Sequence, residues 1–289
     1  MRFAITGADG MLGRALVARL ADHDVVALTE PAFSLEDQEV VNGAIAGAQP
    51  HWVVHTAAMT DVDGCELNPR KAYSVNALGT RHVAAACRAC GAGLLYISTD
   101  FVYGRRAVRT PIEAWEHGDP LSVYGLSKWG GERYVEALAP RFMIARTAWL
   151  YGEGGRHFVG TVLRKAKEGS LLHVVNDQTG NPTYARDVAE AVSRLLEREA
   201  PGWYHLVNTG ETTWYGFARA ALEMSGLDPE QVQPCSSAEL GRPAPRPAYS
   251  SLSTFTYREM VGVDFRPWRE ALKDYLSGSG NPGSSRGAD

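Results

Sequence analysis

The chain has 289 residues, of which 45% are hydrophobic and 21% charged, and its formal net charge at pH 7 is −4. This length fits one large domain or two modest ones, with the composition of an ordinary soluble protein. The slightly acidic balance excludes a general attraction to nucleic acid or to an anionic membrane. Because no stretch approaches the ~20 apolar residues of a membrane span and Asp9 interrupts the apolar start, we expect a cytoplasmic protein without a secretory signal.

The first half of the sequence alternates short apolar strands with helical patterns. Near-continuous apolar strands between helices are typical of a parallel sheet covered on both faces, which is the doubly wound, Rossmann-type α/β fold. In chain order, the expected strands are 3–5, 25–28, 52–55, 94–97 and 142–145. The helices expected between them are 11–20, 35–46, 72–90 and 122–139.

The second half is less regular and contains a proline-rich segment at 241–247. We predict that residues 1–150 form a dinucleotide-binding domain to which some later segments return. Residues 151–276 are expected to form mainly a smaller substrate-binding lobe. Residues 277–289, rich in glycine and serine, are expected to be a flexible tail. Helices are expected at 158–168, 185–198 and 215–225, and strands at 172–175 and 204–207.

Four cysteines are present, and we expect them to be reduced thiols, because a chain of this length needs no disulfide framework. Cys87 and Cys90 have the spacing of a redox pair or of half a zinc site. No second cysteine pair or nearby histidine completes a tetrahedral site, so small residues inside an alanine-rich helix are the better explanation. We therefore predict no metal.

A glycine-rich turn lies between the first expected strand and the first expected helix. It runs from Gly7 through Gly10, Met11 and Leu12 to Gly13. Such glycines let the backbone turn tightly and let a pyrophosphate approach the free amides and the dipole of the helix N-terminus. This position after a strand and before a helix is the context that a dinucleotide-binding motif requires.

Two further strand ends complete the predicted cofactor crevice. Glu30, just past the second strand, stands where an acidic residue binds the adenosine ribose hydroxyls. The third strand is followed by Ala57, Ala58 and Met59, whose small neighbours leave room for a ligand close to the backbone. We therefore expect these residues to bind NADPH or NADH.

Tyr124 and Lys128 are four residues apart on an expected helix and so face the same way. A ketone needs a proton as hydride arrives. The pKa of tyrosine is about 10, and a neighbouring ammonium lowers it. We interpret Tyr124 as the general acid and Lys128 as the group that lowers its pKa and holds the nicotinamide ribose. Thr99, at the end of the fourth strand, is expected to hold the substrate oxygen beside Tyr124.

Together these motifs resemble the extended short-chain dehydrogenase/reductase superfamily, and the similarity is greatest to its dTDP-4-dehydrorhamnose reductase branch. The resemblance spans roughly residues 1–275. The stretches that resemble this branch are 57–63, 74–77, 98–103, 146–152, 175–183 and 242–252.

The resemblance implies reduction of the 4-keto group of dTDP-4-dehydro-L-rhamnose to dTDP-L-rhamnose, with NADPH or NADH as the cofactor. It assigns catalysis to Thr99, Tyr124 and Lys128. A nucleotide-sugar is then the expected partner, without nucleic acid or membrane, and a homodimer stays open. The residues that the resemblance places on the substrate side are Thr99, Asp100, Trp149, Arg242 and Arg246.

Three departures from this branch limit what the resemblance implies. Tyr249 stands where asparagine is expected, which affects local nucleotide contacts. The loop 104–117 has its own sequence, so the exact sugar stays open. Members of the branch can bind a divalent ion at a dimer contact through glutamates, but Ala15 occupies one of the expected positions.

Three other functions share parts of this sequence pattern. Sugar-nucleotide dehydratases carry the motif Thr-Asp-Glu after the fourth strand, because elimination needs an acid–base carboxylate. In this chain Phe101 stands in place of that glutamate, which argues against a dehydratase. Epimerases share the tyrosine and the lysine, so an epimerase stays an alternative. A non-catalytic subunit resembling the regulatory subunit of methionine adenosyltransferase is the third, and the intact Thr99, Tyr124 and Lys128 favour an enzyme over it.

Overall fold

A six-stranded parallel sheet with the order β10-β5-β4-β3-β1-β2 is the centre of the computed structural model, which describes residues 1–105 and 109–279. The strand order reverses between β1 and β3, and such a reversal opens a crevice at the carboxyl ends of the strands. The doubly wound α/β fold predicted from the sequence is confirmed. The strands are β1 (Arg2–Thr6), β2 (Asp24–Leu28), β3 (Trp52–His55), β4 (Gly93–Thr99), β5 (Phe142–Thr147) and β10 (Gly202–His205).

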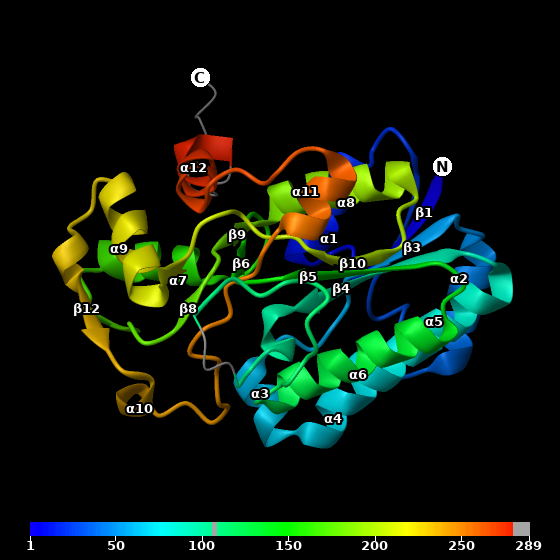
Figure 1. Ribbon diagram of the computed structural model, residues 1–289, viewed down its shortest axis with the longest axis horizontal. Coiled ribbons are helices and arrows are strands. Elements are labelled where there is room, and N and C mark those ends of the chain that lie inside the picture. The colour runs from blue at the N-terminus through cyan, green and yellow to red at the C-terminus, as the bar shows by residue number, and fades with distance from the viewer. Residues whose placement is uncertain (106–108, 280–289) are drawn as a thin grey trace.

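Helices cover both faces of this sheet (Figure 1). Successive side chains of a strand point to opposite faces, so Leu95 and Ile97 of β4 pack with one set of helices and Leu94 and Tyr96 with the other. Burial on both faces explains why the strands read as continuous apolar runs. The first set is α1 (Met11–Arg19), α8 (Ala185–Arg198) and α11 (Phe255–Val261), and the second is α2 (Gln38–Ala48), α5 (Gly79–Cys90) and α6 (Val123–Leu138).

The single helix expected at 72–90 is interrupted, so this prediction is wrong in detail. It begins earlier, as α4 (Pro69–Tyr73), and passes through a π-helical turn at Ser74–Leu78 before α5. The wider turn leaves Asn76 buried, with its side chain available for tertiary contacts. Apolar periodicity continues through the turn, so the sequence pattern alone does not reveal it.

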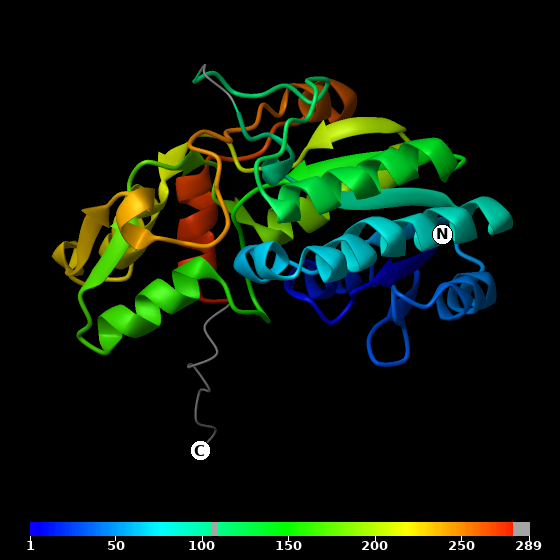
Figure 2. The same cartoon turned by 90° about the horizontal axis from the view of Figure 1, so that it is seen from below.

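A second group of elements lies beyond one end of the main sheet, as Figures 1 and 2 show. The strand expected at 204–207 is not part of this group, because β10 forms the edge of the main sheet beside β5. The division of the chain at residue 150 stays a prediction. The helices of the group are α7 (Phe158–Lys167), α9 (Trp214–Met224), α10 (Ser237–Leu240) and α12 (Trp268–Asp274), and its two-stranded ladders are β7 (Leu172–Val175) with β12 (Val232–Cys235), β8 (Thr179–Gly180) with β11 (Thr212–Thr213), and β6 (Leu150–Tyr151) with β9 (Thr183–Tyr184).

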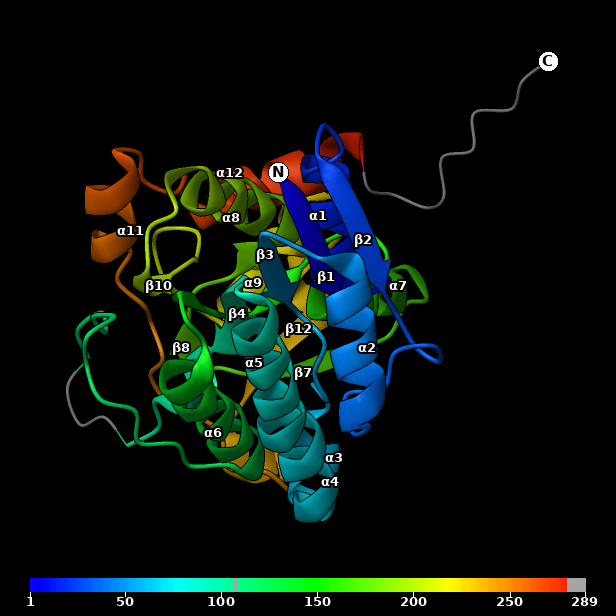
Figure 3. The same ribbon diagram turned by 90° about the vertical axis from the view of Figure 1, so that its right-hand side faces the viewer.

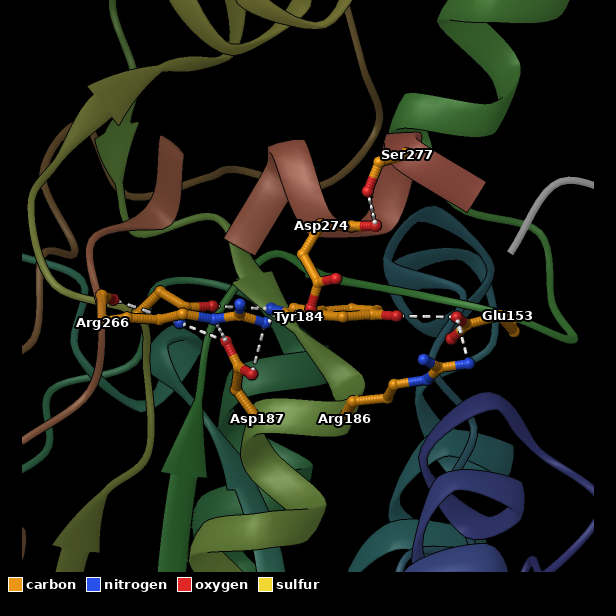
Figure 4. Close-up of polar contacts among 8 residues, drawn as sticks. Glu153, Tyr184, Arg186, Asp187, Arg266, Asp274 and Ser277 are labelled. Atoms are coloured by element: carbon orange, nitrogen blue, oxygen red, sulfur yellow. Dashed lines mark hydrogen bonds and ion pairs between the residues drawn. The ribbon is translucent and has the colours of Figure 1, made fainter. Parts of the chain in front are cut away.

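A polar network ties α8 of the main body to α12 (Figure 4). Asp187 on α8 binds the Arg266 guanidinium through both carboxylate oxygens at 2.8 Å, and Arg266 also pairs with Asp274 at 2.8 Å. The Tyr184 hydroxyl donates to Glu153 at 2.6 Å. These contacts join the start of α8 to Glu153, which follows β6, and through Arg266 to α12.

The short helix α3 (Val62–Leu67) lies beside α6 and is capped by Asp61, whose side chain accepts a hydrogen bond from the Gly64 amide. Figure 3 shows α3 and α4 at one end of the α5 and α6 layer.

Within the described residues, no helix is both long enough and apolar enough to cross a membrane. A helical turn runs through Tyr275–Ser279, where the expected tail begins, and residues 280–289 lie outside the described part, so the flexible tail stays a prediction.

Candidate functional site

A cleft of about 1140 Å³ opens between the carboxyl ends of the main strands and the second group of elements. Every site residue predicted from the sequence lines this cleft. They are Gly7, Gly10, Met11, Leu12, Gly13, Glu30, Ala57, Ala58, Met59, Thr99, Asp100, Tyr124, Lys128, Trp149, Arg242 and Arg246.

Two glycines allow the turn after β1 to close against its neighbours. Gly7 has a φ of +65°, and a Cβ there would lie 2.9 Å from the Ala57 backbone at the end of β3. A Cβ on Gly13 would lie 2.1 Å from the Gly7 carbonyl oxygen. The first amides of a helix have no intrahelical partner, and its N-terminus carries partial positive charge. This corner therefore suits a pyrophosphate.

The π-helical turn connects the cofactor side of the cleft with α6. The Asn76 side chain accepts the Met59 amide at 2.8 Å and donates to the Met59 carbonyl at 3.0 Å. It also donates to Ser127 Oγ at 3.0 Å, and Ser127 in turn donates to the Tyr124 carbonyl at 2.8 Å. The loop after β3 is thereby held in register with the helix that carries Tyr124 and Lys128.

Two buried hydroxyls at the strand ends are available to a ligand. Ser98 Oγ on β4 and Thr147 Oγ1 on β5 have no hydrogen-bond partner within the part of the chain that the structure describes. Both residues line the cleft. A buried, unpaired hydroxyl costs about 1–3 kcal/mol, so polar ligand groups at this edge are favoured.

Tyr124 and Thr99 meet at the centre of the cleft. Ser122 caps α6 by accepting the Gly125 amide at 3.2 Å, which places Tyr124 in the first turn of that helix. The Thr99 side chain lies beside the Tyr124 phenol, where it favours the charged form of the phenol. Thr99 Oγ1 also accepts the Phe101 amide at 3.2 Å and donates to Asp100 Oδ1 at 3.1 Å. The phenol is thus held at the end of β4, as the sequence motifs predict.

The electrostatics of Tyr124 and Lys128 differ from the sequence-based expectation. Burial raises the pKa of Tyr124 above its ordinary value, against a smaller lowering by the Thr99 hydrogen bond. The prediction that the Lys128 ammonium lowers this pKa is therefore wrong for the chain by itself. Lys128 Nζ donates to the Ile97 carbonyl at 2.8 Å and lies 4.2 Å from the centre of the Tyr96 ring. Burial lowers the pKa of Lys128 to about 7, while the Glu132 carboxylate opposes that change.

Asp100 has a structural contact that its position in the motif does not reveal. Its Oδ2 accepts the Ser250 hydroxyl at 2.6 Å, which ties the segment after the proline-rich stretch to the end of β4. Burial raises the pKa of Asp100 to about 6, although the hydrogen bonds from Ser250 and Thr99 favour its charged form.

Arg242 and Arg246 are paired with a carboxylate and are not free loop charges. Arg246 lies 3.0 Å and Arg242 3.3 Å from Asp63 on α3, and the Ala244 amide donates to Asp63 at 3.2 Å. This contact joins the proline-rich segment to the opposite wall of the cleft. It holds two guanidinium groups at the mouth of the cleft, where they suit a diphosphate.

Trp149 is held in an unusual conformation. Its φ is +45°, a left-handed conformation that costs a non-glycine residue about 1–3 kcal/mol. Its indole stacks on that of Trp214, with ring centroids 3.7 Å apart and planes 8° apart. Both side chains are half-buried and line the cleft, so Trp149 is a wall of the site and not a core aromatic.

Sequence reasoning missed several residues of this cleft. Thr147 stands at the end of the fifth strand and lines the cleft. The ends of the other parallel strands indicated site residues, so the same reasoning applies to Thr147. Trp214 carries no such local signal, because its partners are distant in the sequence. Asp63 and Asn76, which hold the walls of the cleft, belong to the stretches 57–63 and 74–77 that resemble the family, but the sequence assigns them no role.

The departures from the family pattern also have structural counterparts. Phe101 packs edge-on against Tyr124, with ring centroids 5.5 Å apart, where a dehydratase would need a carboxylate. The Tyr249 hydroxyl donates to Glu211 at 2.7 Å. Part of the loop 104–117, residues 106–108, lies outside the described residues.

In the described ranges, no group of three or more His, Cys, Asp or Glu side chains could hold a metal ion, and Cys87 and Cys90 are free thiols.

Comparison with known proteins extends over almost the whole chain. The family model described as RmlD substrate binding domain matches residues 1–280. A dTDP-4-dehydrorhamnose reductase of Mycolicibacterium smegmatis is 40% identical over 280 residues, covering 96% of this chain and 85% of that protein. The spore coat polysaccharide biosynthesis protein SpsK of Bacillus subtilis is 41% identical over 274 residues, covering 94% and 95%. The crystal structure of a Bacillus anthracis dTDP-4-dehydrorhamnose reductase in complex with NADP superposes with a TM-score of 0.92 at 35% identity, covering 96% of this chain and 98% of that one.

Proposed function

The chain belongs to the RmlD substrate binding domain family, and on that premise we propose that it reduces the 4-keto group of a dTDP-linked 4-keto-6-deoxysugar with NADPH or NADH. The substrate that the relatives favour is dTDP-4-dehydro-L-rhamnose, which gives dTDP-L-rhamnose. The chain is accordingly an NAD(P)H-dependent oxidoreductase.

The observation that carries the proposal is the placement of the Tyr124 phenol of α6 beside the Thr99 hydroxyl, where β4 ends in the cleft. A raised pKa keeps the phenol protonated at neutral pH, which is the state that a proton donor needs. Thr99 and Tyr124 together present two hydroxyls to a carbonyl oxygen in the cleft. General acid catalysis of this kind contributes roughly 10²–10⁴-fold to a rate.

The other half of the cleft suits the dinucleotide. The turn from Gly7 to Gly13 and the amides at the start of α1 would hold the pyrophosphate, and Glu30 would hold the adenosine ribose. Ala57, Ala58 and Met59 would line its path, and Lys128 would contact the nicotinamide ribose. When bound, the nicotinamide supplies the hydride.

The chain's own residues then complete the reduction. Tyr124 donates its proton to the oxygen of the 4-keto group as the carbon is reduced. Thr99 hydrogen-bonds the same oxygen and the phenol, which fixes the direction of the transfer. Lys128, whose pKa burial lowers to about 7, would hold the nicotinamide ribose beside the phenol. Arg242 and Arg246 bind the diphosphate, and Trp149 excludes water from the sugar side.

Two observations weigh against the rival functions. Phe101 gives no proton donor or acceptor at the position where a dehydratase carries glutamate. The cleft retains both halves of a reductase site, which a purely regulatory subunit does not need. An epimerase of the same superfamily shares Tyr124 and Lys128 and is the remaining alternative. The four free cysteines support the expected cytoplasmic location, and a homodimer stays open.

A coupled assay tests the proposal. Purified protein is mixed with dTDP-4-keto-6-deoxyglucose, a 3,5-epimerase and NADPH, and the cofactor absorbance and the sugar product are followed together. We expect stoichiometric oxidation of NADPH and formation of a 4-hydroxy dTDP-sugar. Conversion of the sugar without cofactor consumption when the 3,5-epimerase is left out would favour an epimerase, and no oxidation of either cofactor in the full mixture would favour a regulatory role.

A further inference from the structure

The stacked indoles of Trp149 and Trp214 come from separate parts of the chain and meet in the cleft. Trp149 follows β5 directly, two residues beyond Thr147, which pairs with Thr99 across the sheet. Trp214 is the first residue of α9, which is capped by the Thr213 side chain accepting the Gly216 amide at 3.0 Å. One wall of the cleft is thus built from two different elements next to the proposed proton donor.

The conformation of Trp149 requires support from its surroundings. A bulky residue with φ of +45° persists only where neighbouring contacts hold it there. The backbone is held on one side, since the Trp149 carbonyl accepts the Thr183 amide at 3.2 Å. The indole packs against Gly180, where a Cβ would come within 2.7 Å of the ring, so only glycine leaves room for it. The ring also stacks on Trp214 and packs against the buried cluster that contains Val102 and Leu252.

Trp214 is itself fixed from behind. Phe158 of α7 meets its indole edge-on, with ring centroids 4.6 Å apart and planes at 61°. Trp149, Trp214 and Phe158 therefore form a continuous aromatic series that runs from the second group of elements to the end of β5. A rotation of Trp149 out of its present position would break this series at its first contact.

We propose that Trp214 is a positioning residue, which holds the Trp149 indole as a rigid wall against the apolar face of the deoxysugar. This inference rests on the proposed function and names a residue to which sequence reasoning gave no role. The ring carbons and the methyl group of a 6-deoxysugar are apolar, and aromatic side chains pack on such surfaces. Trp149 contacts the sugar, whereas Trp214 acts through Trp149.

The arrangement predicts an effect on sugar binding that leaves the cofactor half alone. Trp214→Ala removes the stack, and Trp149 then loses its fixed orientation. We expect the Kd of dTDP-L-rhamnose and the KM of the keto-sugar to rise roughly three- to tenfold, the range that one aromatic pair supports. The KM of NADPH and the value of kcat should stay within about twofold of the wild type.

Four variants test the proposal: Trp214→Ala, Trp214→Phe, Trp149→Ala and the double variant Trp149→Ala/Trp214→Ala. Binding of dTDP-L-rhamnose is measured by calorimetry, so that the result does not depend on turnover. The stack itself is followed by the exciton couplet that two close indoles give in far-ultraviolet circular dichroism. Trp203→Ala is the control for loss of an indole outside the cleft, because Trp203 on the edge strand β10 is exposed, meets Phe142 edge-on and does not line the cleft.

We expect Trp214→Ala to lose the couplet and weaken sugar binding, and Trp214→Phe to restore the binding because a phenyl ring can stack in the same place. The double variant should bind no more weakly than Trp149→Ala, since Trp214 acts through Trp149. Additive losses in the double variant, unchanged binding in Trp214→Ala, or the absence of a couplet in the wild type would each overturn the proposal. So would failure of the wild type to bind dTDP-L-rhamnose. A wild type that binds but does not turn over would refute the proposed function alone.

Discussion

Replacing Arg146 by methionine should destabilise the protein strongly, because it leaves a carboxylate buried beside the catalytic helix. Arg146 on β5 is 3% exposed and binds Glu132 on α6 through two hydrogen bonds, of 2.8 and 2.7 Å, while Glu132 is fully buried. Breaking a buried pair typically costs about 3–5 kcal/mol, since one charge remains without its partner. Arg133 lies 3.6 Å from the same carboxylate and should reduce the loss, so we expect about 3 kcal/mol.

The double variant Arg146→Met/Glu132→Met separates this cause from a simple loss of packing. It removes both charges, and we expect it to recover most of the lost stability, because apolar replacement of a buried pair is often close to neutral. Tyr103, whose hydroxyl also accepts a hydrogen bond from Arg146, accounts for a remaining loss of about 1 kcal/mol. The free energy of unfolding is measured in urea for all variants. A loss below about 1 kcal/mol in Arg146→Met, or a double variant no more stable than Arg146→Met, would refute the reasoning.

Three further predictions concern the cleft. Tyr124→Phe should lower kcat by roughly 10²–10⁴-fold while NADPH binding, measured by fluorescence titration, stays within a few-fold of the wild type, and a wild-type kcat would remove the phenol from the mechanism. Glu30→Ala should shift the ratio of kcat/KM values toward NADPH by about fivefold, because a carboxylate repels the 2′-phosphate, whereas an unchanged ratio would mean that Glu30 faces solvent. Asp100→Asn tests the raised pKa of about 6 of the Asp100 carboxyl. Because the folded chain favours the protonated carboxyl, Asp100 contributes stability fully below its ordinary pKa of 3.8, and this contribution is lost as the pH rises through about 6. The difference in unfolding free energy between wild type and Asp100→Asn should therefore fall by about 2 kcal/mol between about pH 4 and 7, and a difference independent of pH would contradict the shift.

Local patterns predicted much of the fold and the cofactor half of the site. The turn from Gly7 to Gly13 follows a strand and precedes a helix, and its demands on the backbone are visible in the residue types themselves. Tyr124 and Lys128 share a helix face because of their spacing alone. The strand ends at Ala57 and Thr99 lie together because parallel strands end at the same edge of a sheet.

Contacts between distant segments could not be predicted in this way. Asp63 pairs with Arg242, which is 179 residues away, and no periodicity relates the two. The π-helical turn that directs Asn76 inward leaves the apolar pattern unbroken. The pKa of Tyr124 depends on how completely the folded chain covers it, so the sequence suggested a lowering where burial produces a rise.

Transfer of label from the cofactor to the sugar tests the central claim most directly. The protein is incubated with dTDP-4-keto-6-deoxyglucose, a 3,5-epimerase and NADPH deuterated at the transferable position of the nicotinamide, and the product is examined by NMR. The account predicts one deuterium at C4 of the sugar and a matching amount of oxidised cofactor, with both signals lost in Tyr124→Phe. A 4-keto or isomerised sugar without deuterium at C4 would contradict it.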